Sequence, residues 1–283
     1  MKRVKRLNVQ GLARKAPEIM KHILPEDGCV LVSIDLSAGE PTITTEFSKD
    51  PNYRYATFDG IGKVPHYQDG VLMIDDLYLM VASVNPVTAD DMREAFPMIR
   101  DSWLADPDLV KKKLDRIRKL NKMGALALGY GMGPKKMVRQ FNDAGFRIDM
   151  KQAQGFFNAY WLLFKCIKKF GERLQRQVEI DGYIVNPFGY RLVPEKIKAF
   201  NYFIQSSVSG QMAVFNIKLL AAAPYCRLLT IIHDELLVEV PESRLEEFKL
   251  AKELATKSLN DDLAWSVDVR TGFAVGVDWY TAK

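Results

Sequence analysis

The chain has 283 residues, 48% of them apolar and 27% charged, and a formal net charge of +5. That length supplies a core for one large domain or two modest ones, and the composition excludes disordered and collagen-like chains. No apolar stretch approaches the roughly 18 residues that a membrane span needs. The three cysteines and three histidines are scattered, so the sequence predicts neither a disulfide framework nor a zinc site. We expect a cytoplasmic protein in a reducing compartment, with no membrane partner.

The predicted elements mix strands and helices. In chain order, the sequence predicts a strand over 29–36, an irregular segment over 51–70, helices over about 88–132 with a break near 106–107, one long helix over 150–180, a hairpin over 183–193, a helix over 196–223, two strands within 228–240, a further helix and a final strand over 265–277. Thr88 with Asp91, and Ser243 with Glu246, are capping-box signals for two of these helices. Strands cluster at both ends of the chain with helices between them, which predicts an α+β fold whose sheet domain is interrupted by a helical insertion.

Basic residues are concentrated in two segments. Residues 1–15 carry lysines and arginines without an acid, and residues 111–122 carry a second cluster that only Asp115 interrupts. A solvated helix face accounts for one such cluster, and the first segment also resembles an organelle presequence, although no apolar segment or small-residue cleavage site follows it. More than one cluster in a chain favours a polyanionic partner such as nucleic acid.

Two carboxylates occupy the ends of predicted strands. Asp35 lies at the end of the apolar run CVLVSIDL (29–36), one residue before its last, and Asp234, followed by Glu235, lies at a tight turn between two apolar runs. A single carboxylate at a strand end is commonly a solvated turn residue. Two carboxylates on one sheet can instead share Mg²⁺ ions, which prefer hard oxygen ligands and recruit substrate phosphates. The sequence leaves open whether Asp35 and Asp234 meet.

The predicted helix over 114–132 supplies complementary groups. Arg118, Lys122, Leu126 and Tyr130 are spaced by four and therefore follow one helix face. Two cations followed by an apolar and an aromatic residue match the triphosphate, sugar and base of a nucleotide. The alternative is a surface helix whose Leu and Tyr face the core.

Glycines are unusually dense at the end of this helix. Gly124, Gly129, Gly131 and Gly133 lie within ten residues, and each glycine costs up to about 1 kcal/mol inside a helix. Such density predicts a close backbone approach or a moving element, which suits a closing nucleotide lid. The segment contains no GxxxxGK[ST] phosphate-binding loop.

Together these residues resemble the palm and fingers of a family A (DNA polymerase I-like) DNA polymerase. VSIDLSAGE (32–40) is similar to motif A of that family, with Asp35, Ser37 and Glu40 in its positions. Arg118, Lys122 and Tyr130-Gly131 match motif B, and the sequence IHDE (232–235) matches motif C. Asn201 and Gln205 match a helix that contacts the primer-template, and VGVDW near the end is similar to the closing segment of the family.

The resemblance implies a right-hand polymerase fold with an antiparallel palm sheet and an inserted helical fingers subdomain. It places the palm at 1–50 and 185–283, with motif A in the first part and motif C and the last strand in the second. It places the fingers at 51–184, with the motif B helix at about 114–132. It also implies that the thumb and the exonuclease are absent, and we therefore expect one half of a split, viral-type polymerase with a second polypeptide as partner.

Roles for individual residues follow from the same resemblance. Asp35 and Asp234 are expected to bind two Mg²⁺ ions, for which Mn²⁺ can substitute, with Glu235 near the primer terminus. Arg118 and Lys122 are expected to hold the dNTP triphosphate, and Lys122 to protonate pyrophosphate. The remaining expected contacts are Leu126, Tyr130 and Glu40 with the nucleotide, and Asn201, Gln205, His233 and Tyr130 with DNA.

Some positions depart from the family pattern. Leu126 stands where motif B has an aromatic residue, Ala127 replaces the following glycine, and Ala38 replaces a commonly polar residue. Tyr78 falls where the family often has a histidine near the triphosphate. Because leucine does not stack like an aromatic ring, sugar discrimination is expected to differ.

The function expected from the sequence is template-directed addition of dNTPs to a primer 3′-OH. A non-catalytic nucleic-acid-binding subunit with the same fold is the alternative, and loss of Asp35, Asp234, Lys122 or Arg118 would have favoured it. An RNA-synthesising enzyme is a third possibility that Glu40 and the sequence His233-Asp-Glu disfavour. The sequence contains every residue whose loss would have favoured either alternative: Asp35, Asp234, Lys122, Arg118, Glu40 and His233.

Overall fold

The structure is a computed structural model that describes residues 17–232 and 234–282. The described chain forms two compact units. The first contains the described residues up to Ile43 and from Gln205 onward, and the second contains Thr44–Ile204. No helix in these described ranges is both long and apolar enough to cross a membrane.

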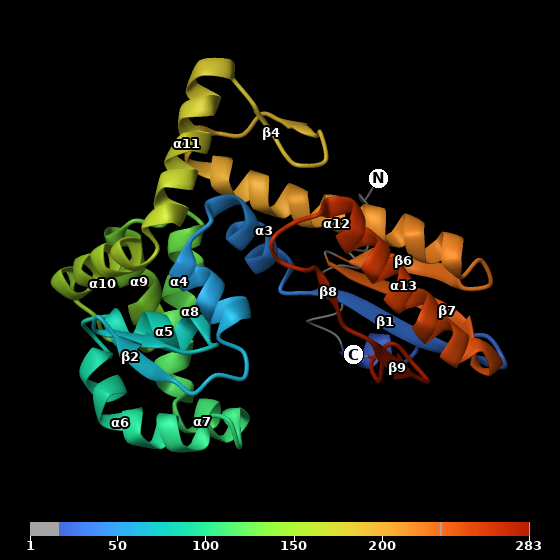
Figure 1. Ribbon diagram of the computed structural model, residues 1–283, viewed down its shortest axis with the longest axis horizontal. Helices are drawn as coiled ribbons and strands as arrows, with labels where there is room; N and C mark the ends of the chain where they lie inside the picture. Colours follow the sequence, from blue (N-terminus) through green and yellow to red (C-terminus); the bar gives the residue numbers. More distant parts are fainter. Residues whose placement is uncertain (1–16, 233, 283) are drawn as a thin grey trace, which may run out of the picture. The chain divides into compact units, whose positions relative to one another are not determined.

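The first unit is built on an antiparallel sheet (Figure 1). Its strands are β1 (Cys29–Ser37), β6 (Arg227–Ile232), β7 (Glu235–Pro241), β8 (Arg270–Thr271) and β9 (Ala274–Gly276), in the order β6-β7-β1-β8 with β9 also paired to β1. In the β1–β7 ladder, Cys29 lies opposite Pro241 and Asp35 opposite Glu235. Strands from both ends of the sequence thus lie side by side, as the sequence pattern predicts.

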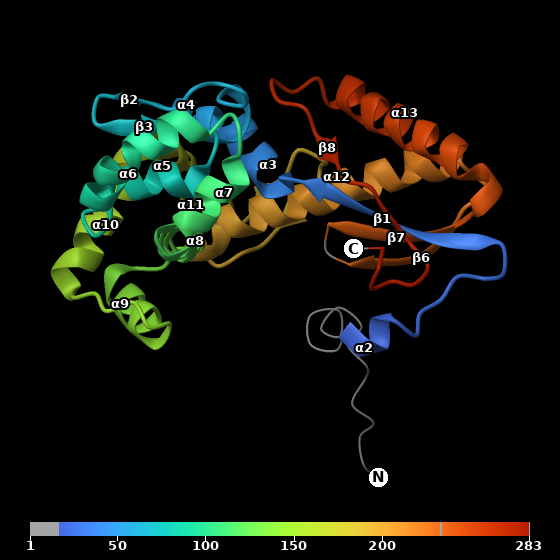
Figure 2. The same cartoon turned by 90° about the horizontal axis from the view of Figure 1, so that it is seen from below.

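Both faces of this sheet are covered. Leu31 and Leu237 pack with Trp279 and with Met20 of α2 (Pro17–Met20) on one face. The alternate side chains of β1 and β7 are also fully or almost fully buried: Val32, Ile34, Leu36, Leu236, Val238 and Val240. Figure 2 shows α2 and α13 (Leu245–Leu263) on opposite sides of the strands. Burial on both faces explains why these strands are continuous apolar runs instead of alternating ones.

The second unit is predominantly helical. Its elements are the end of α3 (Gly39–Ser48), α4 (Pro51–Arg54), a π-helical turn (Tyr55–Asp59), β2 (His66–Gln68), β3 (Val71–Met73), α5 (Leu77–Val84), α6 (Ala89–Ser102), α7 (Pro107–Lys113), α8 (Asp115–Gly129), α9 (Pro134–Asp143), α10 (Met150–Leu163), α11 (Lys165–Asp181), β4 (Ile184–Val185), β5 (Arg191–Leu192), a 3₁₀ turn (Lys196–Lys198) and the start of α12 (Ala199–Ala222). β2 pairs with β3, and β4 pairs with β5.

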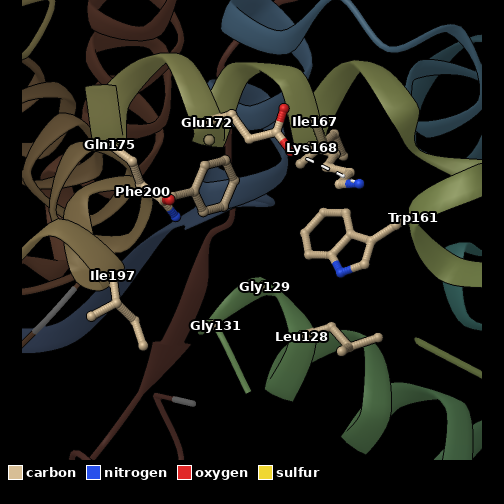
Figure 3. Close-up of a pocket in the computed structure, with 11 residues that line it drawn as sticks. Leu128, Gly129, Gly131, Trp161, Ile167, Lys168, Glu172, Gln175, Ile197 and Phe200 are labelled. Atoms are coloured by element: carbon tan, nitrogen blue, oxygen red, sulfur yellow. Dashed lines mark ion pairs between the residues drawn. The ribbon is translucent and has the colours of Figure 1, made fainter. Parts of the chain in front are cut away.

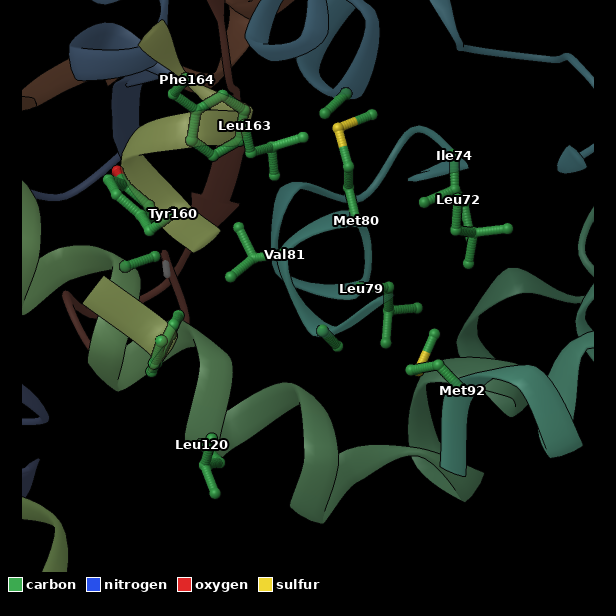
Figure 4. Packing of buried hydrophobic residues seen from close by; sticks show 14 of the residues in the cluster. Leu72, Ile74, Leu79, Met80, Val81, Met92, Leu120, Tyr160, Leu163 and Phe164 are labelled. Atoms are coloured by element: carbon green, nitrogen blue, oxygen red, sulfur yellow. The ribbon is translucent and has the colours of Figure 1, made fainter. Parts of the chain in front are cut away.

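The core of the second unit surrounds α5. Leu79, Met80 and Val81 are fully buried, and they pack with Leu120 of α8 and Phe164 after α10 (Figure 4). α5 is therefore the central helix, and its apolar sequence LYLMVASV is typical of a helix buried on every side. This packing fixes the position of α8, which carries the predicted motif B residues.

The segment 150–180 is two helices, α10 and α11, so the prediction of one long helix was wrong. The break lies at Phe164, which is fully buried and stacks edge-on against Tyr53. The carboxylate of Asp50, itself buried, accepts hydrogen bonds from the backbone N–H groups of Tyr53 (3.1 Å) and Cys166 (3.0 Å). A distant side chain therefore supplies an acceptor at the start of α11. Burial raises the pKa of Asp50.

Other local predictions had mixed outcomes. The strand at 29–36 and the hairpin at 183–193 are confirmed within one or two residues, and the helix predicted at 196–223 is a 3₁₀ turn (Lys196–Lys198) followed by α12 (Ala199–Ala222). The irregular segment 51–70 instead contains α4, a π-helical turn and β2, and 265–277 contains two short strands instead of one. Thr88 precedes α6 but its hydroxyl donates to the carbonyl of Ala82 (2.9 Å), so it forms no capping box. α13 likewise begins without a side-chain cap.

Candidate active site

The two predicted metal ligands lie at the same end of the β1–β7 ladder. Asp35 is opposite Glu235, and the N–H of Leu36 donates to the carbonyl of Asp234 (2.9 Å), so the two aspartates occupy adjacent rungs. Both are exposed, whereas Ile34 and Leu36 beside Asp35 are buried. The sheet therefore places the backbones of two aspartates that are 199 positions apart in the sequence (234 − 35 = 199) on adjacent rungs and leaves both side chains exposed.

A glycine on the neighbouring strand connection makes room for Asp35. The N–H of Gly272 donates to the carbonyl of Asp35 (2.8 Å). A Cβ atom at position 272 would collide with Oδ1 of Asp35, with the carboxyl carbon only 2.9 Å away. The Asp35 carboxylate thus occupies the space that any other residue at position 272 would fill.

Glu235 is held by two neighbours on the same sheet face. The hydroxyl of Ser33 donates to Oε1 of Glu235 (2.9 Å), and the indole N–H of Trp279 lies 3.4 Å from the same oxygen. Ser33 and Trp279 are both buried. These contacts fix the carboxylate next to Asp35, its cross-strand neighbour.

The donor set at this edge fits Mg²⁺. Mg²⁺ takes oxygen ligands, commonly one or two carboxylates, and completes its shell with water and substrate phosphates. Within residues 17–232 and 234–282, no group of three or more His, Cys, Asp or Glu side chains forms a complete metal cage. Asp35 and Asp234 therefore suit ions that a phosphate-bearing ligand helps to hold.

Glu40 lies in the first turn of α3, shortly after β1, and is half-buried. The preceding residue, Gly39, lies so close to α12 that a Cβ atom there would be 3.1 Å from the side chain of Val208. This close approach holds the start of α3 against α12 and restricts where the Glu40 side chain can lie.

The four residues spaced along α8 are all accessible to solvent. Arg118 is half-buried and Lys122 is exposed, while Leu126 and Tyr130 are exposed to 40% and 45%. The opposite face of the helix is buried through Leu120, Asn121, Gly124, Ala125 and Leu128. The alternative of a surface helix with core-facing Leu126 and Tyr130 is therefore wrong. α8 presents two cations, an apolar side chain and an aromatic ring on one exposed face.

The glycines of this segment have different roles. Gly124 contacts α10 so closely that a Cβ atom would collide with the ring of Phe156. Gly131 has a left-handed φ of 75° in the turn after α8, a conformation that favours glycine. A Cβ atom on Gly129 or Gly133 would meet nothing within 4 Å. Close approach thus explains one glycine and backbone conformation another.

A cavity of about 210 Å³ lies at the C-terminal end of α8 (Figure 3). Leu128, Trp161 and Phe200 provide apolar walls, and the ion pair between Lys168 and Glu172 (3.8 Å) lies at its edge. None of the residues that the sequence singled out as site residues lines this cavity.

Sequence reasoning missed a carboxylate beside the cationic face. Nε of Arg118 donates to Oδ2 of Asp76 (2.8 Å), whose side chain is 4% exposed. Asp76 is also the N-cap of α5. An aspartate directly before an apolar helical run is a recognisable capping signal, but nothing in the sequence links it to Arg118. Gly272 gave no local signal either, because its role depends on a strand far away in the chain.

The expected DNA contacts are distributed over two elements. Asn201 and Gln205 are four residues apart on α12, so they share a helix face, and Asn201 is half-buried whereas Gln205 is exposed. His233 lies outside the described residues. Tyr130 lies immediately after α8 and caps its end, with its N–H donating to the carbonyl of Leu126 (3.0 Å).

Comparison with known proteins identifies the family. The sequence model of DNA polymerase family A matches residues 102–281, which contain Arg118, Lys122, Asp234 and Glu235. DNA polymerase I, thermostable, of Thermus filiformis is 27% identical over 98% of this chain and 30% of its own length. DNA polymerase I of Streptococcus pneumoniae (strain ATCC BAA-255 / R6) is 25% identical over 78% of this chain and 27% of its own length.

A solved structure supports the same conclusion at the level of the fold. The polymerase domain of Pol1 from M. smegmatis, in complex with DNA primer-template and dNTP, superposes with a TM-score of 0.70 and 21% identity. The match covers 94% of this chain and 43% of that one. The chain spans about 30% of the length of the Thermus relative. On the match of the family model to most of its length, the chain belongs to DNA polymerase family A.

Proposed function

We propose that this chain catalyses template-directed addition of dNTPs to the 3′-OH of a DNA primer. The observation that carries the proposal is the pair of exposed carboxylates, Asp35 and Asp234, on adjacent rungs at the end of the β1–β7 ladder. The family supports it, because members of DNA polymerase family A generally use divalent metals.

In this proposal Asp35 and Asp234 hold two Mg²⁺ ions, for which Mn²⁺ can substitute. Two bound ions would neutralise charge on the attacking and leaving oxygens of phosphoryl transfer. Glu235, oriented by Ser33 and Trp279, borders the primer terminus. The protein's own contribution is to orient these carboxylates before substrate arrives.

The nucleotide lies along the exposed face of α8. Arg118 and Lys122 bind the triphosphate, Leu126 contacts the sugar, and Tyr130 contacts the base pair. The primer 3′-hydroxyl loses its proton to solvent water as its oxygen forms a bond to the α-phosphorus, and the bond from that phosphorus to the oxygen bridging to the β-phosphate breaks. The ammonium of Lys122 donates a proton to the departing pyrophosphate. Glu40 excludes ribonucleotides because it crowds the 2′ position of the sugar.

The partners proposed for this chain are primer-template DNA, dNTPs and a second polypeptide. Asn201, Gln205, His233 and Tyr130 contact DNA, and the protein works in the cytoplasm. We propose that the chain is the catalytic part of a split polymerase and that the partner supplies the thumb, with or without an exonuclease. High processivity of the purified chain alone on a long template would contradict the split arrangement.

The test is primer extension with Asp234→Asn. Wild-type protein with Mg²⁺ and dNTPs is expected to extend a short primer, and the variant to lose about 100-fold or more of the rate, because one metal ligand is weakened. Thermal unfolding should be unchanged, since Asp234 is exposed at a turn. Retained activity in Asp234→Asn would contradict the metal assignment.

Two further arms separate the alternatives. Extension with dNTPs but not with rNTPs is expected, and equal use of both would indicate an RNA-synthesising enzyme. Binding of the primer-template by wild-type protein without any extension, also in the presence of co-purifying proteins, would indicate a non-catalytic subunit.

A further inference from the structure

The N-terminal end of α5 lies against the two cations of α8. The ring of Tyr78, the second residue of α5, lies 5.1 Å from the guanidinium carbon of Arg118 and 5.6 Å from Nζ of Lys122, measured from the ring centroid. Both distances fall within the range of cation–π attraction. One tyrosine ring thus contacts both cations that the proposed function assigns to the triphosphate.

The carboxylate of Asp76 accepts hydrogen bonds from both α5 and α8. Its Oδ1 accepts the backbone N–H groups of Tyr78 and Leu79 (3.0 Å each), and its Oδ2 accepts Nε–H of Arg118 (2.8 Å). A carboxylate that is 4% exposed is tolerated because three donors satisfy it. The same three bonds fix the guanidinium of Arg118 relative to the start of α5.

The geometry of this pairing leaves part of Arg118 available. Because Asp76 engages Nε, the terminal nitrogens Nη1 and Nη2 have no hydrogen-bond partner in the part of the chain that the structure describes. Two terminal N–H groups in one plane match the two oxygens of a phosphate. Arg118 is therefore anchored at one edge and presents its other edge to an anion.

Lys122 is held without losing its charge. Lys119, on the same helix, is paired with Asp115 (2.7 Å). Lys122 has no carboxylate partner among the described residues, and its ammonium contacts the neutral ring of Tyr78. A ring positions a cation without neutralising it, so the full charge remains for a ligand.

We propose that Asp76 and Tyr78 are positioning residues of the triphosphate site. Asp76 orients Arg118 through Nε, and Tyr78 orients Lys122 and covers the guanidinium. The inference rests on the proposed function, since it requires that α8 binds a nucleoside triphosphate. The resemblance already places Tyr78 near the triphosphate; the inference goes beyond it by adding Asp76 to the site and by giving each of the two residues a separate task in orienting one cation.

Binding measurements without turnover test this proposal. The probes are dATP with Mg²⁺ and, separately, inorganic tripolyphosphate, titrated calorimetrically into the full chain. Tyr78→Ala is expected to weaken dATP binding by about 5- to 20-fold, as two cation–π contacts predict, whereas Tyr78→Phe, which keeps the ring, should stay within about twofold of wild type. Tripolyphosphate should show the same losses, because the contacts concern phosphate alone.

Asp76→Asn tests whether Asp76 orients Arg118 through Nε. Asn keeps an acceptor for the cap of α5 but places an N–H₂ group against Nε–H of Arg118, so about a tenfold loss of affinity is expected. If this variant fails to fold, the Tyr78 pair alone decides the proposal. Lys119→Ala is the matched control on α8 and should leave binding unchanged.

The outcomes distinguish failure of the proposed triphosphate site from failure of the positioning roles of Asp76 and Tyr78. If wild type binds neither probe, or if Lys122→Ala binds as well as wild type, the proposed triphosphate site itself is wrong. If Lys122→Ala loses affinity but Tyr78→Ala does not, only the positioning roles are wrong. In a double-mutant cycle, Tyr78→Ala combined with Lys122→Ala should lose less than the sum of the two single losses, and additive losses would overturn the assignment.

Discussion

At position 272 the absence of a side chain is what leaves room for the Asp35 carboxylate. The backbone of Gly272 is fixed by its hydrogen bond to the Asp35 carbonyl, so it has little freedom to move away. An added methyl group would displace the carboxylate, because the carboxylate is the end of a side chain and the strand is not free to shift. Gly272, which lies outside the expected motifs, thereby determines where the carboxylate of Asp35 in motif A can lie.

Gly272→Ala is accordingly expected to lower primer-extension activity by about tenfold or more while the free energy of unfolding changes by less than about 1 kcal/mol, since rotation of Asp35 relieves the collision. Mn²⁺ binding to the protein, followed by electron paramagnetic resonance, should weaken in parallel. Gly133→Ala is the control, because a Cβ atom there meets nothing within 4 Å. Unchanged Mn²⁺ binding in Gly272→Ala would contradict this role.

At the scale of one element, α8 must satisfy two requirements at once. Its buried face packs closely enough on α10 that Gly124 contacts the ring of Phe156, while its exposed face presents Arg118, Lys122, Leu126 and Tyr130. Small residues on the buried face let the helix approach its neighbours, and the spacing by four keeps the other face for a ligand.

Alanine substitutions at two glycines of α8 are therefore expected to change stability in opposite directions. Gly124→Ala is expected to destabilise by about 1–3 kcal/mol, because Phe156 lies in a closely packed core and must shift. Gly129→Ala, in the same helix with open space around it, should be neutral or stabilising by up to about 1 kcal/mol. Thermal unfolding of both variants checks this. Equal unfolding midpoints for the two variants would contradict a destabilising collision between position 124 and the ring of Phe156.

At the scale of the whole molecule, the net charge of +5 is unevenly distributed. The basic stretch in α7 and α8 includes Lys112, Lys113 and Arg116, which are exposed, and no carboxylate pairs with them within the described residues. Lys111 differs, since it pairs with Asp108 (3.3 Å) and contacts the ring of Trp103. Exposed unpaired cations of this kind attract the DNA backbone through release of counterions.

Binding to primer-template DNA should therefore depend steeply on salt. If about four phosphates are neutralised, affinity is expected to fall on the order of 100-fold between 50 and 200 mM salt. Replacing Lys112, Lys113 and Arg116 together with alanine should lower the slope of log affinity against log salt by about one for each lost contact. Fluorescence anisotropy of labelled DNA measures both slopes. Affinity independent of salt would contradict a phosphate-binding surface.

Periodicity and residue type alone predicted β1, β6 and β7 and the residues that share one face of α8, and residue type at those positions carries the family resemblance. They did so because side-chain spacing decides which face a residue occupies, wherever the chain later packs. The two carboxylates at strand ends were recognisable for the same reason, since each directly follows or precedes an apolar run.

Only the tertiary structure decided the remaining features, because each depends on residues far apart in the sequence. The break between α10 and α11 arises where Asp50, 116 positions before Cys166, accepts its N–H. The placement of Asp35 and Asp234 on adjacent rungs, the space left by Gly272 and the pairing of Asp76 with Arg118 likewise depend on contacts across the fold. Local propensity carries no information about such contacts, which form only when the core brings the elements together.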